Sequence, residues 1–147
     1  MKVSATLLIV SLCLATSAYA DEGSEVQAIT TTLKATFDKP DSPLTVTPIV
    51  TVDGYAIADW SQGGMGGRAL LRRTDGTWHI ALCSGDSLRS VATLHRIGLP
   101  SDTASELAAK LAKAEDGLDK HRLAELAGFS GVVAMDAGPL DASAAAK

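Results

Sequence analysis

Cys83 is the residue of this sequence with the most chemistry open to it. The chain has two cysteines, and the other, Cys13, lies in an apolar segment near the N-terminus. Three hypotheses follow for Cys83: a buried inert thiol, a ligand for a soft metal ion, or a partner in an intermolecular disulfide or redox reaction. Free cysteine is among the most buried residue types, so the inert thiol is the hypothesis against which the others are weighed.

Copper(I) is the metal ion that would suit such a thiol, because it accepts a few soft sulfur or imidazole ligands. Beyond Met1, the methionines of the chain are Met65 and Met135. His79 is a poor partner for Cys83, because four residues of strand would separate them by about 13 Å at roughly 3.3 Å per residue. The alternative for Met65 is a loop methionine that merely packs over an aromatic ring.

Hairpin geometry favours Met65 as the second ligand. The pair Asp75-Gly76 lies between two alternating segments and is a strong signal of a two-residue turn. Pairing outward from that turn would place Arg68 opposite Cys83, where a guanidinium would favour the thiolate. The glycine-rich segment that holds Met65 would then lie at the same end of the hairpin. The sequence therefore predicts Cys83 and Met65 as metal ligands, with copper(I) as the cofactor.

No enzyme motif accompanies these residues. The chain lacks a G-x-S-x-G elbow, an H-E-x-x-H or C-x-x-C pattern and a phosphate loop. A catalytic Cys83 would need a distant histidine as its base, and the three histidines, His79, His95 and His121, are too far apart to form a local ligand set. His95 falls on an apolar stripe, so we expect it to be buried and hydrogen-bonded. We expect a protein that is not an enzyme.

The composition is that of an ordinary globular chain with no preference for polyanions. Hydrophobic residues make up 46% and charged residues 20%, and the formal net charge is −4. A negative chain is not drawn to nucleic-acid backbones or anionic membranes, so we expect no nucleic-acid partner. The one basic cluster consists of Arg68, Arg72 and Arg73, which alternate across a predicted strand and are expected to lie on a solvated sheet face.

Residues 1–20 have the pattern of a cleavable signal peptide. A basic second residue precedes an apolar run at 5–15, and Ala18 and Ala20 place small residues at the two recognition positions of the cleavage site. The apolar run is shorter than the roughly 20 residues that a transmembrane helix needs. We therefore expect export, cleavage before Asp21, and no membrane insertion of the mature chain.

The elements that must position Cys83 and Met65 begin with a helix. Ser24 is the expected N-cap, and apolar residues at helical spacing continue to Phe37. Alternating apolar and polar residues then predict four strands, joined by two Asp-Gly turns and by a glycine-rich loop at 61–67; the strands span 44–52, 55–60, 68–73 and 77–83. Pro48 suits an edge strand.

The fourth strand has a predicted orientation. Period-two alternation places Trp78, Ile80 and Leu82 on the helix-covered side of the sheet. The other side would then receive His79, Ala81 and Cys83.

Beyond this strand the apolar spacing changes to about 3.6 residues, which predicts helices over 88–95 and 104–118 and a short one capped by Asp119. Residues 132–135 are a candidate last strand, and the segment 137–147 has no anchoring pattern and is expected to be disordered. The sequence thus predicts one α+β domain over 21–136: an N-terminal helix, a four-stranded antiparallel meander and C-terminal helices.

A family resemblance rests on residues 60–88, which read W-S-Q-G-G-M-G-G-R-A-L-L-R-R-T-D-G-T-W-H-I-A-L-C-S-G-D-S-L. This stretch resembles the small periplasmic proteobacterial proteins called copper uptake system-associated proteins. The similarity extends to A-T-F-D-K-P at 35–40 and to the Ala-rich C-terminal helices. Family members often end in a His-rich tail, whereas residues 141–147 here read D-A-S-A-A-A-K.

The resemblance implies a periplasmic accessory protein of copper homeostasis or uptake, which binds copper(I) weakly or contacts a copper transporter. The alternative is a metal-free module that binds a small ligand or peptide. A helix on a curved antiparallel meander resembles the cone-shaped nuclear-transport-factor-like and cystatin-like folds, whose concave face holds such ligands, and the fold alone does not choose between these roles.

Overall fold

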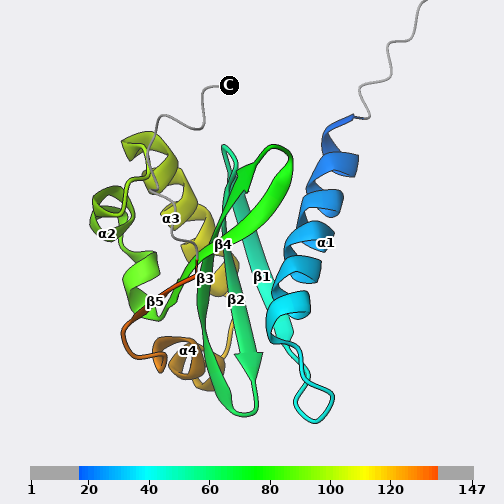
Figure 1. Cartoon of the computed structure of the whole chain (residues 1–147). Helices are drawn as coiled ribbons and strands as arrows, with labels where there is room; N and C mark the ends of the chain where they lie inside the picture. The colour runs from blue at the N-terminus through cyan, green and yellow to red at the C-terminus, as the bar shows by residue number, and fades with distance from the viewer. Residues whose placement is uncertain (1–16, 136–147) are drawn as a thin grey trace, which may run out of the picture.

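Five antiparallel strands form one sheet, and helices cover both of its faces (Figure 1). The structure is a computed structural model that describes residues 17–135. The strands lie in chain order across the sheet: β1 Thr45–Val52, β2 Tyr55–Gln62, β3 Met65–Thr74, β4 Thr77–Ser84 and β5 Val132–Ala134. The α+β class is confirmed, and β1 is an edge strand, as its Pro48 indicated. The predicted count of four strands is too low, because the candidate strand near the C-terminus returns to pair with β4.

The helices divide between the two faces of the sheet. Helix α1 (Ser17–Phe37) covers one face and buries Ile29 and Leu33 there. The other face is covered by the downstream helices, which are η1 Asp86–Arg89, α2 Val91–Arg96, α3 Ser101–Glu115 and α4 Lys120–Ala127. A separate apolar cluster fills each side, so the sheet is buried on both faces.

The predicted start of the first helix is wrong. Ser24 lies inside α1, which begins at Ser17, and the intervening residues include one glycine and no proline that could break a helix. Most of the predicted signal peptide lies outside the described residues, and the predicted disordered tail at 137–147 lies wholly outside them.

Two-residue turns connect the first four strands. Asp53-Gly54 and Asp75-Gly76 each have positive φ at both positions, as a hairpin turn of this type requires, so both predicted turns are confirmed. The predicted glycine-rich loop at 61–67 is wrong. Strand pairing continues to Gln62 opposite Met65, and the turn is only the two glycines between them.

A bulge in β4 changes the predicted orientation of Cys83. Leu70 pairs with Leu82 and Leu71 pairs with Ile80, so Ala81 is an extra residue in β4 and reverses the alternation beyond it. Trp78 and Ile80 pack on the α1 side as predicted. Leu82 faces the opposite side, which helices also cover, and Cys83 shares the α1 side with Trp78 and Ile80, so the predicted division of Leu82 and Cys83 between the two faces is wrong. The bulge also moves Arg68 opposite Ser84, and Cys83 opposite Ala69.

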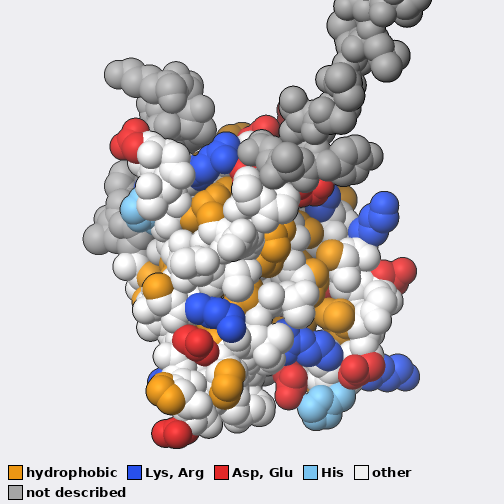
Figure 2. Space-filling model, turned by 90° about the vertical axis from the view of Figure 1, so that its right-hand side faces the viewer, with side chains coloured by type: hydrophobic (Ala, Val, Ile, Leu, Met, Phe, Trp, Pro, Cys, Tyr) orange, Lys and Arg blue, Asp and Glu red, His pale blue; other side chains and the backbone are white. Residues whose placement is uncertain are grey.

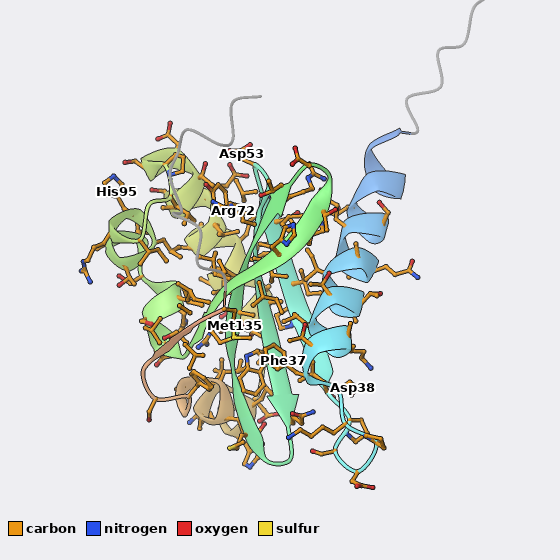
Figure 3. The ribbon with its side chains drawn as sticks, viewed as in Figure 1. Phe37, Asp38, Asp53, Arg72, His95 and Met135 are labelled. Carbon is orange, nitrogen blue, oxygen red and sulfur yellow. The ribbon has the colours of Figure 1, made fainter. Side chains whose placement is uncertain are left out.

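The C-terminal helices agree with the predicted pattern in part. Leu107 and Leu111 belong to the apolar stripe of α3 and are buried, as predicted. The Asp119 side chain accepts a hydrogen bond from the Arg122 amide and caps α4, also as predicted. The predicted 88–95 helix is instead η1 followed by α2, which Ser90 caps. His95 is exposed on α2 rather than buried (Figure 3), because Leu94 is the residue that faces the core.

Candidate functional site

One apolar pocket brings together Cys83 and Met65, the two residues predicted as metal ligands, with Met135 beside them. The pocket has a volume of about 200 Å³ and is lined by residues of the apolar cluster on the α1 side of the sheet. Its lining residues are Phe37, Leu44, Trp60, Gln62, Met65, Cys83, Phe129, Val133 and Met135. Three of these nine side chains carry sulfur.

Local structure explains how each sulfur reaches the pocket. Cys83 is on β4, where the bulge turns it toward α1. Met65 is the first residue of β3, directly after the turn, and is 68% exposed. Met135 follows β5; its amide donates a hydrogen bond to the Ala81 carbonyl at 2.9 Å, and its side chain is 42% exposed. Figure 3 labels Met135 and the pocket residue Phe37, which comes from the end of α1.

Aromatic rings form the wall of this sulfur pocket. Trp60 and Phe129 make an edge-to-face contact with their ring centroids 5.5 Å apart. They approach Gly67 so closely that an added Cβ there would lie 2.9 Å from the Trp60 ring and 3.0 Å from the Phe129 Cβ. A larger residue at position 67 would therefore force the Trp60 ring or its neighbours to shift.

Cys83 is held as a thiol. Its residue is only 5% exposed, and burial raises the pKa of the thiol to about 11. The predicted support from Arg68 is wrong, because that side chain lies on the other face of the sheet, with α3. Among residues 17–135, no group of three or more His, Cys, Asp or Glu side chains is placed to hold a metal ion. The three sulfur atoms of the pocket are soft ligands, unlike carboxylate oxygens.

A cluster of buried charges, which was not predicted from the sequence, lies on the opposite side of the sheet. Arg68 was expected on a solvated face, yet it is fully buried. Its Nε donates a hydrogen bond to Glu115 Oε1 at 2.7 Å and lies 3.6 Å from Asp59 Oδ1. Asp59 is also fully buried and Glu115 almost so. No sequence signal pairs Arg68 with a carboxylate 47 positions away, but its place two residues from buried Leu70 on a central strand could have indicated that it points inward.

The Arg68 guanidinium connects several elements at once. Its Nη1 donates to Asp86 Oδ1 of η1 at 3.1 Å and to the Leu126 carbonyl of α4 at 3.4 Å. Glu115 Oε2 in turn lies 3.0 Å from Arg89 Nε. This Arg68 cluster therefore fastens the ends of α3 and α4 to the middle strand of the sheet.

The pKa of the Asp59 carboxyl is strongly raised. Burial raises its pKa to about 7, and repulsion from Glu115 adds to the shift, while the Arg68 charge acts in the opposite direction. Neither Asp59 oxygen has a hydrogen-bond partner in the structure. A proton on one of the two carboxyls would let it donate to the other, which also favours the protonated form.

The surface on the α1 side carries charges of both signs. Figure 2 shows Lys and Arg side chains interspersed with Asp and Glu side chains on this face, with apolar side chains between them. Such a mixed surface lacks the single-sign field that would attract a polyanion to this face.

Comparison with known proteins returned no relative: no protein-family model, curated protein or solved structure matches the chain. In the stretch 17–135, none of the helices combines the length and hydrophobicity that crossing a membrane requires.

Proposed function

We propose that this protein is an exported accessory protein of copper handling that binds copper(I) in the sulfur pocket. One observation carries the proposal. Cys83, Met65 and Met135 come from three separate strands or strand ends, yet they line one pocket. Thiolate and thioether sulfur are the ligands that select copper(I), and two or three of them suffice.

The chemistry of binding follows from the state of Cys83. Copper(I) replaces the thiol proton, which leaves to solvent, and the resulting Cu–thiolate bond offsets the charge that burial disfavours. Because the pKa of the thiol is about 11, this proton competes with the metal at neutral pH and weakens binding. Weak, reversible binding suits a protein that passes its metal on.

The exposure of the two methionines supports a role in transfer to a protein partner. Met65 and Met135 line the sulfur pocket and are both exposed to solvent, so a copper transporter or another copper-binding protein could exchange ligands with them. Export through residues 1–20 would deliver the protein to the periplasm. Cleavage before Asp21 would leave the packed residues Ile29 and Leu33 of α1 in place.

A second function, binding of a small apolar ligand or an apolar peptide side chain, is supported by the same pocket. Its lining is almost wholly apolar, and its volume of about 200 Å³ exceeds the roughly 150 Å³ of an engineered cavity that takes up benzene. The aromatic wall of Trp60 and Phe129 suits such a ligand. Neither function needs a catalytic base, and no histidine is among the residues that line the pocket.

Titration of the reduced mature protein with copper(I) against a chromophoric chelator tests the first function. The informative variants are Cys83→Ala, Met65→Leu and Met135→Leu. Leucine keeps the size and apolar character of methionine and removes only the sulfur. His95→Ala, at an exposed position on α2, is the matched control.

Copper(I) binding predicts that Cys83→Ala abolishes competition with the chelator and that each leucine variant weakens it, with His95→Ala unchanged. If the wild type competes no better than Cys83→Ala, copper(I) is not bound at this site. Binding of an apolar probe such as benzene that survives in both leucine variants would then favour the second function.

A further inference from the structure

Two buried carboxylates face a single buried guanidinium in the Arg68 cluster. Asp59 on β2 and Glu115 at the end of α3 both lie beside Arg68 on β3, and none of the three side chains reaches solvent appreciably. With both carboxyls ionised, this buried trio has an excess negative charge. An uncompensated charge in the interior costs several kcal/mol, so the trio favours one bound proton.

The other charges around the trio do not remove this excess. Asp86 and Arg89 of η1 contribute one charge of each sign at the solvent edge, where the Asp86 side chain is 60% exposed. Arg122 of α4 acts on Asp59 only as the weakest of the causes that set its pKa, and it pairs with Glu125 at 3.6 Å. The proton therefore remains the principal way to neutralise the pair.

We propose that the Asp59–Glu115 pair is a proton-controlled latch, which holds the α3–α4 corner against the sheet when protonated and releases it when the proton is lost to solvent. The corner consists of the end of α3, residues 116–119 and α4. Arg68 fastens it at two points, the Glu115 carboxylate and the Leu126 carbonyl. When both carboxyls are ionised, repulsion between Asp59 and Glu115 acts directly on the first of these points.

The latch acts on the sulfur pocket through the chain that follows α4. Phe129 lies two residues after α4 and forms the pocket wall with Trp60, which is the neighbour of Asp59 on β2. Release of the corner would therefore loosen this wall. The inference concerns the protein's own conformation and does not depend on which ligand the pocket binds.

Hydrogen exchange of the mature protein tests the latch without any ligand. Backbone protection is compared at about pH 6 and about pH 8.5, after correction for the intrinsic exchange rates. A pKa of about 7 in the closed state and an ordinary value in the open state predict that the opening equilibrium of α4 increases roughly tenfold over this interval. The opening equilibria of the core strands β2 and β3 should change less over the same interval.

Asp59→Asn is the decisive variant, because the amide resembles the protonated carboxyl and stays neutral at every pH tested. It should remove the pH effect on α4, whereas Asp116→Asn, at an exposed position beside Glu115, should retain it. The same pH effect in wild type and Asp59→Asn, or an effect spread evenly over all strands, would overturn the proposal.

A direct titration keeps the proposal testable if Asp59→Asn fails to fold. Carbon-13 NMR of the side-chain carboxyls in the wild-type protein should show one buried carboxyl with a midpoint near 7. Midpoints below about 5 for every carboxyl would rule the latch out.

Discussion

Arg68 Nε lies 2.7 Å from Glu115 Oε1, and this buried contact joins the middle strand of the sheet to the last residue of α3. The attraction within such a buried pair adds little net stability. Removing one partner costs much more, because it leaves the other charge buried and uncompensated. Removing the guanidinium would leave Asp59 and Glu115 buried together with only the half-exposed Arg89 beside Glu115, and this asymmetry gives the first prediction.

Replacing Arg68 with methionine should destabilise the protein by about 3–5 kcal/mol at neutral pH, because the buried carboxyls of Asp59 and Glu115 would lose their one fully buried positive neighbour. The loss should shrink in acid, where those carboxyls take up protons. Urea unfolding measures it. Lys110→Ala removes an exposed pair with Glu106 at 3.2 Å and should cost no more than about 1 kcal/mol. Equal losses for the two variants would contradict the importance of burial.

The stability of the wild type should decrease as the pH rises toward and through neutrality, relative to that of Asp59→Asn. The pKa of Asp59 is raised from 3.8 to about 7, so the unfolded chain gives up this proton more readily than the folded one. The stabilisation that this bound proton gives to the folded state is therefore fully present below about pH 4 and is lost as the pH rises through 7. A shift of this size corresponds to roughly 4 kcal/mol at most.

Urea unfolding of both proteins from about pH 4 to pH 9 gives the difference curve. A flat difference between the wild type and Asp59→Asn would show that the folded state does not hold the extra proton.

Sequence patterns predicted the meander because they depend on neighbouring residues. The Asp-Gly turns and the alternation of β1 to β4 are local signals, and the Asp119 cap requires only residues within one helical turn. The face of Cys83 was predicted wrongly because a bulge at Ala81 adds one residue, and no residue type near it marks the insertion.

The two sites differ in how much of them a sequence can indicate. Met65 and Cys83 were predicted as soft ligands from their residue types, and they share a pocket even though the predicted pairing of Arg68 with Cys83 is wrong by one residue. Burial of Arg68 depends on Glu115, which only the packing of α3 brings to the sheet. A contact of that range leaves no periodic signal in the chain.

Affinity for copper(I) should increase about tenfold per pH unit between about pH 6 and pH 9. The Cys83 thiol must lose its proton to bind the metal, and with a pKa of about 11 it stays protonated throughout this interval. Chelator competition at several pH values measures the slope, and in Asp59→Asn, which lacks the titrating carboxyl of the Arg68 cluster, the slope reports the Cys83 thiol alone. An affinity that does not vary with pH would mean that Cys83 is not a ligand.

Gly67→Ala should destabilise the protein by about 1–3 kcal/mol and disrupt the sulfur pocket, because the added methyl group has no space. Its Cβ would lie 2.9 Å from the Trp60 ring, 3.0 Å from the Phe129 Cβ and 3.1 Å from the Ser84 carbonyl oxygen. The last of these belongs to the backbone of β4 and cannot turn away as a flexible side chain would. The strain must therefore move the Trp60 ring or the Phe129 side chain, which together form the pocket wall.

Gly117→Ala is the matched control, because an added Cβ there meets nothing within 4 Å. It should remain within about 1 kcal/mol of the wild type, since the smaller freedom of alanine in the unfolded chain is the main effect expected. Urea unfolding and copper(I) competition are measured on both variants. A Gly67→Ala protein with wild-type stability and wild-type copper affinity would show that the wall of Trp60 and Phe129 can shift freely, and that the shape of the pocket does not depend on the glycine beneath it.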